Sequence, residues 1–428
     1  MIDIYRKINS YKEFINSILI IFVFITLPFT IKIGNISIIV AAIFNILFFD
    51  KNNVRKLLSP IFLFPLALFV IQCISAFFSF NKELAIKALD LYLLSVLLPI
   101  IILNQNLKDC FFFDILKWFY NSVIVACLIL LVHFLIKLLF NYNYTDLHFH
   151  GFTKILGQHP VYFSLFIVVA FLIDIYTGNF SSISKKKMVH VGILLTSLVL
   201  CSSKAVITIA FLIFLHQFFI HFNKFMNKKN LIFLLFFVFL FFLISPRLMN
   251  RFTDGLVIRH EVLNFKPTDD YYQKKQFSYQ EKTTISDLEL RYIFAKIALY
   301  NLFKKQKILF GFNEGDAQDV LDYNYMSYNL APNWFEGFNV HNQYINYLFY
   351  YGFLGFFIFI FYLIYNTFVL FNGNVIYRYF CILVYFIFLF EVCLVRNKGI
   401  TFFFLFNSLF LTKVVYFENS NNRDQRNP

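Results

Sequence analysis

Apolar segments of about the length of a bilayer recur along most of this chain, and this feature constrains its fold more than any other. A membrane-spanning helix needs about 20 consecutive, mostly apolar residues. Hydrophobic residues make up 59% of the 428 residues and charged residues 14%, whereas a soluble domain has about 25% charged residues. These values exclude a water-soluble globular fold, a disordered chain and a fibrous repeat. We therefore expect an all-α, polytopic integral membrane protein.

Twelve membrane-spanning helices are predicted from these segments. The apolar run from Met188 to Phe222 is too long for one span, and the polar residues 201–204 divide it into two short spans. A turn is likewise expected at 395–399, before the last span. The predicted spans are 14–31, 35–49, 58–80, 87–104, 118–140, 159–177, 188–202, 205–222, 231–246, 343–366, 377–394 and 399–412.

The predicted topology follows from the distribution of cations in the short loops. An even number of spans places both termini on one side, and most Lys and Arg residues of the short loops fall on that same side. The positive-inside rule therefore predicts cytoplasmic termini. Four regions result: residues 1–246 with nine spans, a large external loop at 247–342, residues 343–412 with three spans, and a cytoplasmic tail at 413–428.

The large loop carries the signal of its own amphipathic helix. Ser286 and Glu289 have the spacing of a capping box. Lysines follow near residue 304, where a helix C-terminus favours cations, and Gly311 ends the pattern. The apolar residues that recur at helical spacing are Leu288, Tyr292, Ala295, Leu299, Leu302 and Phe303. We expect this helix to lie on the outer face of the membrane.

A His-Asn pair and two glycines form the most informative motif. His341 and Asn342 lie where the loop re-enters the membrane, and Gly352 and Gly355 follow inside an apolar helix. An interfacial histidine can act as a general base near neutral pH. Glycines three residues apart let another helix or a lipid chain approach closely.

Four further polar residues are predicted at the outer edge of the spans or in the loop. Arg291 lies one turn into the capped helix, where it either binds an anion or pairs with Asp287 at i−4. Lys204 lies in the turn between two short spans and is either functional or a snorkelling lysine. His159 begins the sixth span, and Arg396 lies in the last outer turn, with Glu391 as a structural partner.

These motifs resemble the family of O-antigen ligases, which includes related O-antigen polymerases. The family has a long periplasmic loop ahead of a His-Asn…Gly-x-x-Gly signature, and the match is specific from Arg291 to Gly355. The second glycine of a downstream Leu-Leu-Gly-x-Gly segment is missing here, because Asn313 follows Phe312, and Lys204 stands where the family usually has arginine. The resemblance implies an enzyme of the bacterial inner membrane with its active face in the periplasm.

The implied activity is a metal-independent, inverting glycosyl transfer from a polyprenyl-pyrophosphate-linked glycan, in the biosynthesis of lipopolysaccharide or another surface polysaccharide. His341 would be catalytic, Arg291 and Lys204 would bind the pyrophosphate, and His159, Asn342 and Arg396 are possible substrate-binding residues. No cofactor, metal or nucleic-acid partner is implied. The acceptor is lipid A core in a ligase and a lipid-linked repeat in a polymerase, while protein is a lesser option. A lipid-linked sugar flippase is the alternative from another class; transporters usually show repeated halves, and here the halves differ.

Overall fold

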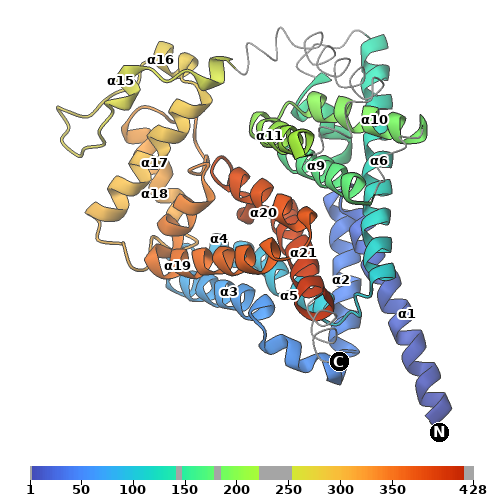
Figure 1. Ribbon diagram of the computed structural model, residues 1–428. Coiled ribbons are helices and arrows are strands. Elements are labelled where there is room, and N and C mark those ends of the chain that lie inside the picture. The colour runs from blue at the N-terminus through green and yellow to red at the C-terminus, as the bar shows by residue number, and fades with distance from the viewer. Residues whose placement is uncertain (1, 141–146, 178–184, 221–252, 419–428) are drawn as a thin grey trace.

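The computed structural model describes residues 2–140, 147–177, 185–220 and 253–418, and it is helical throughout, with no β-strand in these ranges (Figure 1). The first helices are α1 (Ile2–Thr26), α2 (Ile31–Leu47), η1 (Lys51–Leu58), α3 (Pro60–Phe78), α4 (Lys82–Tyr92), α5 (Leu94–Leu103) and α6 (Asp109–Leu139). Next come α8 (His150–Thr153), η2 (Lys154–Leu156), α9 (Pro160–Thr177), α10 (Lys185–Cys201) and α11 (Lys204–Ile220).

The helices after residue 253 fall into two groups. The helices of the predicted loop are α15 (His260–Leu263), α16 (Tyr279–Thr284), α17 (Asp287–Lys304) and α18 (Ala317–Ser327). The remaining helices are α19 (Gln343–Phe371), α20 (Val375–Phe388), η3 (Cys393–Val395), α21 (Asn397–Lys413) and η4 (Val414–Glu418). Figure 1 shows α15 to α18 gathered in one lobe, on the opposite side of the molecule from α1 and α6.

Six of the described helical segments are long and apolar enough to cross a membrane, or seven if the bent pair α2 and η1 forms one span. The six are Pro60–Phe78, Lys82–Leu103, Asp109–Leu139, Pro160–Thr177, Gln343–Phe371 and Asn397–Glu418. The architecture is therefore that of an all-helical polytopic membrane protein. Among the other predicted spans, 188–202, 205–222 and 377–394 overlap the shorter helices α10, α11 and α20, and 231–246 lies outside the described residues.

The last span lies at the centre of the helical bundle. In its apolar window, 83% of the residues are buried, compared with 33% in α3, α6 and α19. Helix α21 packs against α5, while α1 packs against α2 and α6, and α19 against α3 and α20. The outer helices therefore expose many apolar side chains, such as Ile39 and Val132, as a surface that faces lipid requires.

Helix α19 is broken at Gly352, which has φ +62° and ψ −164°. The backbone of residues 308–313 pairs with the break: Phe312 N–H donates to Phe349 O (2.9 Å), and Phe353 N–H donates to Ile308 O (2.8 Å). A break in an apolar surrounding is tolerated only where such partners exist. Gly311 faces the break with φ +73°, and a Cβ on either glycine would collide with the opposing backbone.

The predicted turn and capping box are confirmed in the described structure. Helix α10 ends at Cys201 and α11 begins at Lys204. Ser286 caps α17 and exchanges both hydrogen bonds with Glu289. The buried face of α17 differs from the expected apolar stripe and shares only Leu302 with it; the buried residues are Glu289, Ile293, Phe294, Ile297, Ala298, Asn301 and Leu302. This face is covered by protein rather than lipid, because α17 packs against α18 and α19.

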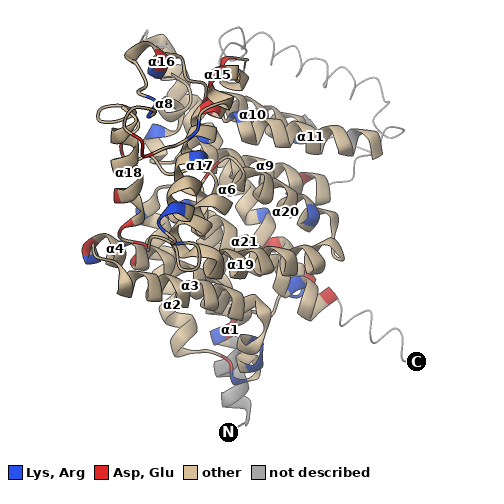
Figure 2. Cartoon of the chain, turned by 90° about the vertical axis from the view of Figure 1, so that its left-hand side faces the viewer, with Lys and Arg blue, Asp and Glu red and all other residues tan. Residues whose placement is uncertain are grey.

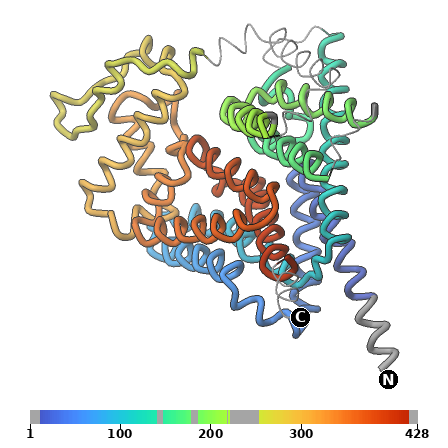
Figure 3. The backbone as a smooth tube through the Cα atoms, viewed as in Figure 1, coloured from blue at the N-terminus to red at the C-terminus, as the bar shows by residue number. Residues whose placement is uncertain are grey.

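The two ends of the described chain, in α1 and η4, lie at the same end of the molecule (Figure 3). The helices α10, α15 and α16 lie at the opposite end in Figures 1 and 2. Charged residues gather mainly at helix ends and in connections, and the bodies of the helices are largely uncharged (Figure 2). This distribution fits a bundle whose middle is surrounded by hydrocarbon.

Replacement of Gly352 by alanine is predicted to destabilise the protein by about 2–4 kcal/mol, because the residue needs a glycine-specific conformation and its Cβ would collide with Leu309. The measurement is thermal unfolding of the purified protein in detergent. The control is Gly192→Ala in α10, where no atom lies within 4 Å of the added Cβ. Equal melting temperatures for Gly352→Ala and wild type would contradict the assignment.

Candidate functional site

The connection after α20 is the point where several of the predicted residues meet. The side chain of Asn342 donates to Leu389 O (3.1 Å), and Arg291 Nε donates to Phe390 O (3.1 Å). Leu394 N–H donates to the side chain of Gln343 (2.7 Å). Residues 389–394 are thereby held by α17 and by the start of α19. These bonds satisfy backbone groups that the end of α20 leaves without helical partners.

His341 faces the carboxylate of Glu391 in this connection. Its Nδ1 lies 3.8 Å from Glu391 Oε2, and the two side chains are 21% and 13% exposed. This Nδ1 is buried and makes no hydrogen bond within the described residues. The backbone of His341 has φ +49°, which is uncommon for a residue other than glycine. Its ring lies beside those of Phe294 and Phe338. Strained residues of this kind concentrate at functional sites.

His159 lies near the same carboxylate, and Arg396 lies near His159. Glu391 interacts electrostatically with His341, His159 and Arg291, and His159 interacts with Arg396 and His341. The ring of His159 lies 4.9 Å from that of His150, centroid to centroid, in the connection before α9. Arg396 is exposed and precedes α21. Burial lowers the pKa of His159 to about 4, so this histidine is neutral near pH 7 and Arg291 supplies the fixed positive charge beside the carboxylate.

Lys204 and Arg291 are linked through Asp287. Lys204 Nζ forms an ion pair with the carboxylate of Asp287. Arg291 Nη1 donates to the main-chain oxygen of Asp287 (2.8 Å), not to its carboxylate. Arg291 and Asp287 are therefore paired at i−4, through the main-chain oxygen instead of an ion pair. The side chain of Asp287 is 55% exposed, so this ion pair is open to solvent and weakly stabilising.

A continuous series of contacts connects these residues. It runs from Lys204 to Asp287, on to Arg291, through the backbone of Phe390 to Glu391, and ends at His341. Four parts of the chain contribute: the start of α11, the first turns of α17, the residue before the N-cap of α19, and the connection after α20. The result is an anion-attracting group of cations beside a histidine–carboxylate pair.

From the sequence, Glu391 is expected only as a structural partner of the nearby cations. A usable signal was present, because Glu391 is the only acidic residue between Val375 and Lys413. It falls inside the predicted span 377–394, where an ionisable side chain usually has a function. What the sequence lacked was the pairing with His341, which is 50 positions earlier in the chain.

Other candidate residues lie apart from this series of contacts. Gly352 contacts the backbone of Leu309, and Gly355 lies against Tyr351 and against Ile71 of α3. Lys398, two residues after Arg396, is buried and donates to Leu27 O (2.8 Å), just after the end of α1. Within the described ranges, no group of three or more His, Cys, Asp or Glu side chains is arranged to bind a metal ion.

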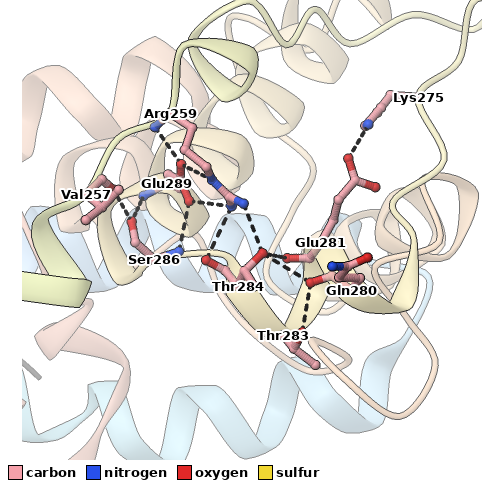
Figure 4. A network of polar contacts seen from close by, with 9 residues as sticks. All are labelled: Val257, Arg259, Lys275, Gln280, Glu281, Thr283, Thr284, Ser286 and Glu289. Atoms are coloured by element: carbon pink, nitrogen blue, oxygen red, sulfur yellow. Dashed lines mark hydrogen bonds and ion pairs between the residues drawn. The ribbon is translucent and has the colours of Figure 1, made fainter.

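A buried network fixes the start of α17 and therefore the position of Arg291 (Figure 4). Arg259 donates to both carboxylate oxygens of Glu289 (2.9 and 2.8 Å), whose side chain is 0% exposed. Arg259 also bonds to Thr284. Burial raises the pKa of Glu289, but the hydrogen bonds from Arg259 and from backbone N–H groups outweigh it and hold this pKa below its ordinary value.

No protein-family model matches the sequence, and no curated protein matches it at a significant level.

Replacement of Arg259 by alanine is predicted to lower the free energy of unfolding by about 2–4 kcal/mol, because it leaves the carboxylate of Glu289 buried and unpaired. The matched control is Lys275→Ala, which removes an ion pair with Glu281 whose side chains are 46% and 31% exposed and costs no more than about 1 kcal/mol. Thermal melting of both purified variants measures the difference. Similar losses in the two variants would show that the Arg259 network does not fix α17.

Proposed function

We propose that this protein is a membrane glycosyltransferase of the O-antigen ligase type, which transfers a polyprenyl-pyrophosphate-linked glycan to an acceptor. The observation that carries this proposal is the series of contacts from Lys204 and Arg291 to Glu391 and His341. A flippase needs no such group at one end of its bundle, whereas a transferase with an anionic leaving group needs both cations and a base.

Arg291 and Lys204 are proposed to bind the pyrophosphate. A guanidinium offers two parallel donors to phosphate oxygens, and a lysine adds a point charge. The donor must displace Asp287 from Lys204, which the solvent exposure of that ion pair permits. Positive charge placed here stabilises the pyrophosphate as it takes the electron pair of the breaking bond to the anomeric carbon.

His341 is proposed to receive the proton of the acceptor hydroxyl. The hydroxyl oxygen forms the new bond to the anomeric carbon while the pyrophosphate leaves from the opposite face, so the anomeric centre is inverted. Glu391 lies on the Nδ1 side of the ring, which leaves Nε2 for the acceptor. A carboxylate in this position orients an imidazole and stabilises the imidazolium that forms.

The proposed topology has twelve spans, cytoplasmic termini and a periplasmic active face in the bacterial inner membrane. Two observations support it: both ends of the described chain lie at one end of the molecule, and α15 and α16 of the predicted periplasmic loop lie at the other (Figures 1 and 3). The span at 231–246 in this proposal lies outside the described residues.

His341→Ala is predicted to reduce glycan transfer by at least about 100-fold, because the acceptor hydroxyl loses its base. The measurement is transfer from purified lipid-linked donor to acceptor in detergent, with equal amounts of folded protein. His260→Ala is the matched control, since His260 is an exposed histidine of the same predicted loop. A fully active His341→Ala protein would refute the mechanism.

Arg291→Ala is predicted to lower kcat/KM for the donor by about 10–100-fold, the value of a charge-assisted hydrogen bond to phosphate. Arg291→Lys keeps the charge but loses the two parallel donors of the guanidinium. Its kcat/KM is expected to fall between those of Arg291→Ala and wild type. Lys307→Ala removes an exposed cation after α17 and serves as the control. Equal losses in Arg291→Ala and Lys307→Ala would indicate a general charge effect instead of a donor site.

Gel electrophoresis of the surface polysaccharide from a deletion strain distinguishes the two acceptors. A ligase deletion removes every ladder band while lipid-linked polymer accumulates, and a polymerase deletion leaves core plus one repeat. An unchanged gel would contradict both activities. The ligase is the first candidate because of the His-Asn…Gly-x-x-Gly spacing, and the polymerase is the second.

A further inference from the structure

Residues 313–316, here called the clasp, join the lobe to the connection between α3 and α4. The clasp makes hydrogen bonds with the end of α3 and with that connection. Glu314 N–H donates to Ser75 Oγ (2.8 Å) and Gly315 N–H donates to Ser79 Oγ (3.0 Å). In the other direction, Phe80 N–H and Asn81 N–H donate to the carboxylate of Asp316 (both 2.9 Å). The partners are about 235 positions apart in the chain. The clasp is therefore a long-range tertiary contact that holds the lobe on the helical bundle.

The carboxyl group of Glu314 lies among tyrosines at the centre of the clasp. Tyr92 of α4 donates to one of its oxygens (3.0 Å), and Tyr351 of α19 donates to the other. Tyr347 and Tyr350 also act on it electrostatically. Within the described residues, the ionisable groups that act on Glu314 are tyrosines, and no cation is among them. Glu314 is half-buried, and a carboxylate withdrawn from water in this way is normally paired with a cation.

The clasp is continuous with the break in α19. Residues 308–313 pair with the backbone around Gly352, and Tyr351 precedes that glycine. The half of α19 before the break, residues 343–351, therefore contacts both the clasp and the residues that precede the clasp in the chain, 308–312. This half-helix begins two residues after His341. Movement of the clasp would be transmitted to the start of α19.

We propose that residues 313–316 form a pH-sensitive clasp, closed at acidic pH and more readily opened as the pH rises, that sets the position of the half of α19 beginning after His341. The consequence for His341 rests on the proposed function, whereas the opening of the clasp does not.

The direction follows from the enclosure of the carboxyl group. Burial raises the pKa of Glu314 from 4.5 to about 7, against the two tyrosine hydrogen bonds, which lower it. An opened clasp exposes the carboxyl to water, where its ordinary pKa applies. Closure is therefore most favourable below pH 4.5 and weakens as the pH rises to about 7. Over this window the opening constant rises by about two orders of magnitude and then levels off.

The test is hydrogen–deuterium exchange of the full-length protein in nanodiscs between pH 5 and 8. The opening constant of residues 308–316 is obtained by dividing the observed rate by the intrinsic rate at each pH. We expect the wild-type value to rise at least tenfold from pH 5 to pH 7 and Glu314→Gln to give a flat profile near the wild-type value at pH 5. Glu336→Gln, which removes an exposed carboxyl of the same predicted loop, keeps the wild-type slope.

Tyr92→Phe provides a second variant if Glu314→Gln does not fold. It removes a hydrogen bond that favours the ionised carboxyl. The opening constant of residues 308–316 should therefore continue to rise to a higher pH than in wild type. A flat wild-type profile overturns the proposal, and so does a wild-type slope in Glu314→Gln. An active His341→Ala protein would refute the proposed function and leave the exchange result unaffected.

Discussion

The pairing of backbone groups between residues 308–313 and the break in α19 is the interaction on which the rest of the structure depends. A helix interrupted within an apolar environment exposes N–H and C=O groups that find no water. Here the partners come from the segment after α17, and two glycines with positive φ, Gly311 and Gly352, allow the backbones to meet. This contact joins the lobe to the bundle and fixes the direction of the half-helix that follows His341.

The candidate site is organised around the balance of one carboxylate and several cations. Glu391 is partly buried and His341 lies 3.8 Å away, while Arg291 is held by main-chain oxygens on both sides, at Asp287 and Phe390. A guanidinium bound in this way keeps its charge and is fixed without a carboxylate of its own. Glu391 acts on this charge electrostatically, but within the described residues Arg291 forms no ion pair with a carboxylate, so it can still attract an anion. Lys204, in contrast, must first leave Asp287.

Much of the local structure could be predicted from the sequence, because it depends on local chemistry. The capping box at Ser286 and the turn before Lys204 are examples. The buried face of α17 could not be predicted, because its residues Ile293 and Phe294 are as apolar as the expected stripe, and only the packing against α18 and α19 distinguishes the two faces. The partnership of Glu391 with His341 also depends on tertiary structure, since it joins two connections separated by α19 and α20.

The clasp and the site favour opposite protonation states of partly buried carboxyl groups. Glu391 lies beside Arg291 and His341, so its ionised form is compensated by positive charge. Glu314 accepts hydrogen bonds from tyrosine hydroxyls, with no cation beside it in the described part of the chain, and is best accommodated when neutral. The two carboxylates lie at opposite ends of the same half of α19. Glu314 contacts Tyr351 at its end, and Glu391 contacts His341, two residues before its start. A change in pH between 4.5 and about 7 therefore acts on the end at Tyr351 through Glu314, and the half-helix provides a rigid connection from there to His341.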